Sequence, residues 1–203
     1  MNKILIATRN KDKFKIVSKL LSTSFFKKYN FYNLNDLDEK IIDKDESGDV
    51  INRSYEKAKN AYDSIKKNDF KYIVGIDDGI KIRGEIIENV KELIKSIIND
   101  EYLNNDEIVY IVRAYTFFDN TGDFYKILTE IPFKYKKITY NLEIEKNSYP
   151  LSHVLKTLDS EKTVIEQNFD ESNNYYLKYS EHKFKDVKEY FDDKNRWWSK
   201  KNN

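Results

Sequence analysis

A chain of 203 residues with 36 basic and 35 acidic side chains has almost no net charge, so no overall positive field favours nucleic acid or an anionic membrane surface. The length suits one domain with a buried core, and no apolar stretch approaches the roughly 20 residues of a membrane-spanning helix. The sequence contains no cysteine, which excludes disulfides and thiolate chemistry and is typical of a reducing compartment. We therefore expect a cytoplasmic protein with neither a nucleic-acid nor a membrane partner.

The first part of the chain alternates strand and helix patterns, which is typical of an α/β fold. Residues 3–7 form a continuous apolar run and predict a buried strand, and residues 12–21 carry apolar side chains at helical spacing. The elements expected next are a short strand at 31–34, a loop at 35–49, a long helix at 50–67 and a buried strand at 72–76. One face of the long helix carries small side chains, which suits close packing on a sheet.

A β-hairpin is predicted after residue 106. Residues 107–118 and 123–131 have the composition of strands, and the turn between them contains Asn120 and Gly122. Both of these residue types favour the positive φ angles of tight hairpin turns. We expect Pro132 to close the hairpin.

The remaining segments complete one predicted domain with a mixed sheet. Residues 85–99 have the apolar spacing of an amphipathic helix, and residues 138–144 have the composition of a further strand. Apolar positions from 177 to 191 indicate a C-terminal helix. We therefore predict a single α/β domain at 1–192 and a polar, frayed tail at 193–203.

The loop between the first strand and the first helix is a candidate phosphate site. Helix N-termini offer backbone N–H groups and the positive end of the helix dipole, and both favour phosphate. Thr8 and Asn10 add hydrogen-bond donors, and Lys13 lies in the first helical turn. The alternative is a solvated loop in which Asn10 or Asp12 caps the helix.

Asp77, Asp78 and Gly79 follow a predicted buried strand, and sites in open α/β sheets lie at the carboxyl ends of strands. Two carboxylates there can bind Mg²⁺ through oxygen, and one can orient or deprotonate a water molecule. Gly79 allows a tight turn without a side chain that blocks the ligand. The alternative is an acidic junction between a strand and a turn, with both charges solvated.

A third candidate is the polar stripe formed by Asp49, Asn52 and Glu56 on the long helix. A carboxylate on this stripe can complete a metal site with Asp77 or Asp78. The alternative for each residue is a solvated helix face.

Three segments together resemble the pyrophosphatases of non-standard purine nucleoside triphosphates (ITPases). Residues 4–13 are similar to the family's opening strand and T-x-N-x-x-K phosphate loop, which Thr8, Asn10 and Lys13 match. Residues 57–61 resemble the following helix. Residues 74–80 resemble the acidic strand end, although they lack the serine of the family's Asp-Asp-Ser-Gly and are closer to the inosine/xanthosine triphosphatase branch.

The resemblance implies an elongated α/β fold with a mixed central sheet flanked by helices and two lobes around a central cleft. The implied activity is Mg²⁺-dependent hydrolysis of ITP, XTP and dITP to the monophosphate and pyrophosphate. Lys13 and its loop then hold the phosphates, Asp77 and Glu56 bind Mg²⁺, and Asp78 contributes to the metal site and orients the attacking water. Glu56 is preferred to Asp49 and Asn52 because its spacing from Asp77 is close to the family's.

The half of the site that reads the base departs from the family. Its Ser-His-Arg segment is missing, and its aromatic base loop is replaced near Ser148, Tyr149 and Pro150. We expect Tyr149 to stack on the base with His153 nearby, which predicts poor discrimination among purines. From the residues alone, without the resemblance, we expect His153 to have a structural or surface role. A catalytically weakened nucleotide-binding or regulatory protein is the alternative function, and a homodimer is expected.

Overall fold

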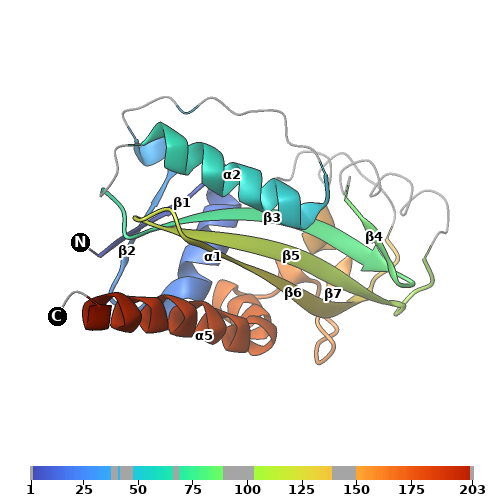
Figure 1. Cartoon of the computed structure of the whole chain (residues 1–203). Coiled ribbons are helices and arrows are strands. Elements are labelled where there is room, and N and C mark those ends of the chain that lie inside the picture. Colours follow the sequence, from blue (N-terminus) through green and yellow to red (C-terminus); the bar gives the residue numbers. More distant parts are fainter. Residues whose placement is uncertain are drawn as a thin grey trace. The chain divides into compact units, whose positions relative to one another are not determined.

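The computed structural model describes residues 2–37, 41, 48–65, 69–88, 103–138 and 150–201 (Figure 1). Contacts between residues divide the chain into two compact units. The first unit comprises Met1–Asp77, Ala114–Leu128 and Ser180–Asn203, and the second comprises Asp78–Arg113 and Thr129–Tyr179. Each unit is discontinuous in sequence because three long strands and the last helix pass from one unit into the other.

Seven strands of the described residues form one mixed sheet. The strands are β1 (Lys3–Ile6), β2 (Asn30–Asn33), β3 (Tyr72–Ile82), β4 (Glu85–Ile87), β5 (Ile108–Asp119), β6 (Phe124–Tyr135) and β7 (Leu155–Lys156). Their order is β2-β1-β3-β5-β6-β7, with β4 paired to β3. β1 is parallel to β2 and to β3, whereas the β3–β4 and β6–β7 pairs are antiparallel. The predicted α/β class with a mixed sheet is confirmed.

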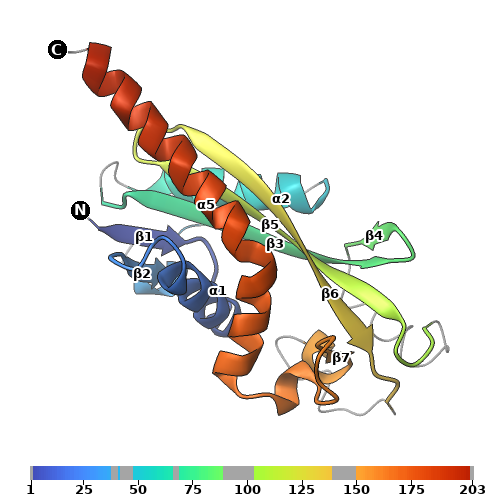
Figure 2. The same ribbon diagram turned by 90° about the horizontal axis from the view of Figure 1, so that it is seen from below.

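The main helices are α1 (Lys11–Thr23), α2 (Val50–Ser64) and α5 (Phe169–Lys201), and short 3-10 turns lie between elements. Within the first unit, neighbouring side chains of β5 face different helices. The Phe117 ring lies 6.5 Å from the ring of Phe184 on α5, and the Phe118 ring lies 5.5 Å from the ring of Tyr55 on α2. Figure 2 shows the face that α1 and α5 cover. The sheet of this unit is thus buried on both faces, because successive strand residues point to opposite sides.

Helix α2 packs on β3 through small side chains. Ser54, Ala58 and Ala61 are buried, which confirms the predicted stripe of small residues. Opposite them stands Gly75, where a Cβ atom would lie only 2.0 Å from the carbonyl oxygen of Ser54. The missing side chain therefore sets how closely the helix approaches the strand.

The helix predicted at 85–99 is wrong over its first residues. Residues 85–87 form β4, in which Ile87 pairs with Ile80 of β3. The turn between the two strands holds Arg83 at φ 49° and Gly84 at φ 93°, and this reversal returns the chain to the sheet. Residues 89–102 lie outside the described residues, so the rest of that prediction is untested.

The predicted hairpin of β5 and β6 is confirmed, with Gly122 at φ 93° in its turn. Pro132 does not close it, because β6 continues to Tyr135. The β7 partner of β6 reaches only Lys134 and Tyr135, so a proline is tolerated at position 132. The carbonyl oxygen of Pro132 instead accepts a hydrogen bond of 2.5 Å from the Tyr175 hydroxyl.

The C-terminal helix is confirmed and longer than predicted, since α5 begins at Phe169 and runs to Lys201. The domain boundary at residue 192, the frayed tail and the cleft between lobes stay predictions. Residues 139–144 of the predicted late strand are outside the described residues. In the described part of the chain, no helix combines the length and apolar character that crossing a membrane requires.

Candidate functional site

The predicted phosphate loop lies between β1 and α1, as expected. Asn10 caps α1, and its side-chain oxygen accepts hydrogen bonds from the N–H groups of Asp12 at 3.0 Å and Lys13 at 2.9 Å. Thr8 Oγ1 accepts the N–H of Asn10 at 3.2 Å. Asn10 therefore has the capping role that the alternative interpretation gave it, and Lys13 lies partly buried in the first turn.

The loop leaves β1 in the direction in which β3 runs toward Asp77. Ile6 of β1 is in register with Val74 of β3, and the N–H of Ala7 donates to the carbonyl oxygen of Val74 at 2.8 Å. Because β1 and β3 are parallel, both strands run in the same direction beyond this pair of residues. Asp77 follows Val74 by about 10 Å of strand, while the loop containing Thr8 begins beyond Ala7.

The prediction that Asp77 and Asp78 end a strand is wrong. β3 continues through both residues and through Gly79 to Ile82, so Gly79 is a buried strand residue and makes no tight turn. Consecutive side chains of a strand point to opposite faces of the sheet. The two carboxylates therefore cannot converge on one ion or one water molecule.

Asp77 faces α2 and binds two cations there. Its Oδ2 accepts a 2.6 Å hydrogen bond from Arg53 Nε, and its Oδ1 accepts one of 2.6 Å from Lys57 Nζ. Arg53 Nη1 donates to the carbonyl oxygen of Gly48 at 2.8 Å. Arg53, Lys57 and Asp77, hereafter the Asp77 cluster, carry a net charge of one positive unit. Their side chains are only 15%, 22% and 11% exposed, respectively.

Asp78 forms a buried ion pair in the second unit. Its Oδ1 accepts a 2.5 Å hydrogen bond from Arg113 Nε, and the two side chains are 12% and 1% exposed. The Arg113 guanidinium also lies 5.3 Å from the centre of the Tyr176 ring, within the range of a cation–π interaction. The Asp78 carboxylate therefore has a buried cation as its partner.

The predicted polar stripe on α2 does not reach Asp77. Asp49 caps the helix, and its side chain accepts the N–H of Asn52 at 2.8 Å. Asn52 and Glu56 are exposed. The side chains that do contact Asp77 were missed, although Arg53 immediately precedes the buried Ser54 in the helix. Arg53 and Lys57 lie four residues apart, and each precedes a buried small residue, so both occupy the helix face next to the one that packs on the sheet.

The described residues do not fit the Mg²⁺ site that the resemblance implied. Magnesium prefers carboxylate oxygens, and both oxygens of Asp77 already bind cations. Asp78 is paired with Arg113 on the other face of the strand, and Glu56 is exposed on α2. No group of three or more His, Cys, Asp or Glu side chains among the described residues is placed to hold a metal.

Of the two residues predicted to lie at the base, only His153 belongs to the described part of the chain. Tyr149 lies outside the described residues, so its predicted stacking on a base is untested. His153 ends a 3-10 turn at Pro150–His153 and is partly buried in the second unit.

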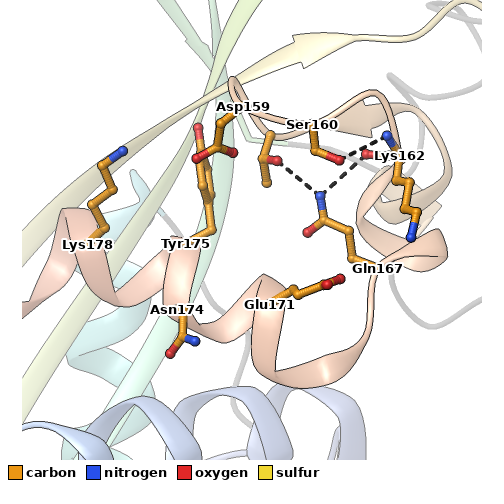
Figure 3. Close-up of a pocket in the computed structure, with 9 residues that line it drawn as sticks. Asp159, Ser160, Lys162, Gln167, Glu171, Asn174, Tyr175 and Lys178 are labelled. Atoms are coloured by element: carbon orange, nitrogen blue, oxygen red, sulfur yellow. Dashed lines mark hydrogen bonds between the residues drawn. The ribbon is translucent and has the colours of Figure 1, made fainter.

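A polar pocket of about 550 Å³ lies in the second unit (Figure 3). Gln167 Nε2 spans part of it with hydrogen bonds to Thr157 Oγ1 at 3.0 Å and the carbonyl oxygen of Lys162 at 3.4 Å. Burial raises the pKa of the Tyr175 hydroxyl, which keeps this group neutral. The residues that line the pocket are Thr157, Asp159, Ser160, Lys162, Gln167, Glu171, Asn174, Tyr175 and Lys178. Its two acidic and two basic side chains balance, so it offers no net attraction for a triphosphate, and the predicted substrate residues are not among those that line it.

Neither a family model nor a curated protein matches the sequence. Solved structures do match. A HAM1 protein from Coxiella burnetii covers 92% of this chain and 98% of its own at a TM-score of 0.61 and 13% identity. The match to the Staphylococcus aureus Ham1 protein covers 83% of this chain and 88% of that protein, with a TM-score of 0.56 and 15% identity. The match to a nucleoside-triphosphatase or dITP/XTP pyrophosphatase from Mycobacterium abscessus covers 87% of this chain and 93% of that protein, with a TM-score of 0.53 and 15% identity. The chain therefore has the fold of the Ham1 and ITPase-like proteins, as the resemblance implied.

Proposed function

We propose that the protein binds nucleoside triphosphates at the loop after β1 and hydrolyses them to the monophosphate and pyrophosphate. The observation that carries this proposal is the parallel pairing of β1 with β3: the loop of Thr8 and Lys13 follows β1 in the same direction in which β3 runs from Val74 to Asp77. Support comes from the shared fold, since one structure of that fold is named a dITP/XTP pyrophosphatase.

In this proposal, cationic side chains supply most of the binding energy. Lys13 contacts the phosphates from the first turn of α1, and Arg53 and Lys57 stabilise the negative charge that develops as water breaks the bond between the α- and β-phosphates. Asp77 is the carboxylate on the α2 face and orients the attacking water. Asp78 is not assigned that role, because Arg113 holds it on the other face.

A second candidate function is nucleotide binding without turnover. The observation that favours it is the pairing of each carboxylate with a cation. Asp77 binds Arg53 and Lys57, and Asp78 binds Arg113. A paired carboxylate is a weak base, because a nearby positive charge favours its ionised form.

Incubation with a panel of nucleoside triphosphates is expected to release pyrophosphate, measured separately from orthophosphate. Lys13→Ala should raise the dissociation constant for the triphosphate about tenfold, since it removes one charge-assisted contact of roughly 1.4 kcal/mol. The matched control is Lys15→Ala, an exposed lysine of the same helix. Orthophosphate as the only product would contradict the proposed reaction. Tight binding with no product at all would favour the second candidate.

We also expect weak discrimination among purine bases. A site that hydrogen-bonds a specific group rejects analogues that lack it, whereas stacking accepts every base. The expected ratio of kcat/KM between ITP and ATP is therefore below about a hundredfold, or about 2.7 kcal/mol. A larger preference for ITP or XTP, measured side by side with ATP and GTP, would show that specific base recognition is present.

A further inference from the structure

In the Asp77 cluster, Arg53 and Lys57 bind the carboxylate that the resemblance assigned to a metal ion. Arg53 Nε donates to Asp77 Oδ2, and Lys57 Nζ donates to Asp77 Oδ1. Both carboxylate oxygens therefore accept a hydrogen bond from a cationic side chain. Arg53 is fixed at a second point by the carbonyl oxygen of Gly48. The cluster is thus an ordered, partly buried cationic group that is built from α2 and β3.

We propose that Arg53 takes the place of a divalent cation at Asp77, so that this site binds the polyphosphate of a nucleotide without a metal ion. The inference rests on the proposed nucleotide binding and names the chemistry of that same site. A guanidinium stays protonated in proteins, so Arg53 cannot leave Asp77 by losing its charge. A divalent ion at this carboxylate would be repelled by both neighbouring cations.

The cluster also has the properties of an anion site. Arginine binds phosphate oxygens through several donors in a fixed plane, and lysine binds them as a point charge. One positive unit remains after Asp77 is neutralised, and low exposure strengthens its attraction for an anion. Asp77 holds the two cations in place, so they are arranged before the ligand arrives and lose little freedom on binding.

The test measures binding of inorganic triphosphate and of ITP to the full chain by calorimetry, in excess chelator and again in excess Mg²⁺. We expect dissociation constants within about threefold of each other in the two conditions. Arg53→Gln should weaken binding in chelator tenfold or more. It also releases Asp77 Oδ2, so added Mg²⁺ should now recover part of the lost affinity. The control is Lys59→Gln, which removes a half-exposed α2 lysine paired with Asp63 and should leave both constants unchanged.

The unaltered protein decides the question even if Arg53→Gln does not fold. Binding that is lost in chelator and restored by Mg²⁺ would overturn the inference and leave the proposed function intact. Absence of binding in both conditions would overturn the inference and the proposed function together. Equal weakening by Arg53→Gln and Lys59→Gln would show a general charge effect and would also overturn the assignment to Arg53.

Discussion

Gly75→Ala is expected to destabilise the protein by about 3 kcal/mol, at the upper end of the range for overpacked cores. The new Cβ atom would lie 2.0 Å from the Ser54 carbonyl oxygen and 2.6 Å from the Ala58 nitrogen. Both are backbone atoms of α2, so no side-chain rotation relieves the clash. Alanine is otherwise at least as compatible with a strand as glycine, and the loss is therefore due to the contact with the helix.

The comparison variant is Gly84→Ala, which tests strain without a clash. Gly84 has φ 93°, and no atom beyond its chain neighbours lies within 4 Å of the added Cβ position, so the expected cost is about 1 kcal/mol for the left-handed conformation. Both free energies of unfolding come from denaturant titrations. A Gly75→Ala protein as stable as the parent would show that α2 does not pack on β3 at the described distance.

Local apolar patterns were sufficient to predict most of the fold. β1, α1, α2 and the β5–β6 hairpin follow from runs and spacings within single segments, and each is confirmed. The segment at 85–87 could not be assigned in this way, because a short apolar run suits a strand or a helix equally. The strand conformation of 85–87 depends on the turn at Arg83 and Gly84, which returns the chain to pair with β3.

The candidate site was predicted less well, for reasons that the residues show. Two adjacent charges beside an apolar run suggest a turn, and the sequence therefore predicts a strand end at Asp77 and Asp78. Ile80 and Ile82 are buried on either side of Lys81, and this alternation was the available signal that the strand continues. The cations that pair with Asp77 and Asp78 come from segments 20 to 35 residues away, and the pattern of the strand itself does not reveal them.

The side chains that bind Asp77 depend on the sequence of α2 and do not follow from the fold. In this chain β3 carries Asp77 where the strand meets α2, and the helix contributes Arg53 and Lys57 to that carboxylate. A shared fold does not fix the reaction. Substitution at Arg53 therefore tests the proposed metal independence more directly than substitution at the exposed Glu56.

Asp78→Ala is expected to cost about 3 kcal/mol of stability or more, because it leaves the buried Arg113 charge without its carboxylate partner. If Asp78 instead orients the attacking water, as the sequence alone suggested, its loss would reduce turnover and leave stability almost unchanged. Denaturant titration and pyrophosphate release on the same samples separate the two roles.

A double-mutant cycle with Arg113→Met makes this distinction independent of the single variant. Replacing both members of a buried ion pair by apolar groups is often nearly neutral, so Asp78→Ala with Arg113→Met should be more stable than Asp78→Ala alone. Recovery will be incomplete by about 1 kcal/mol, because Arg113 also loses its contact with the Tyr176 ring. Additive effects of the two substitutions would contradict the ion pair, whereas a recovered free energy of unfolding assigns Asp78 to the stability of the second unit.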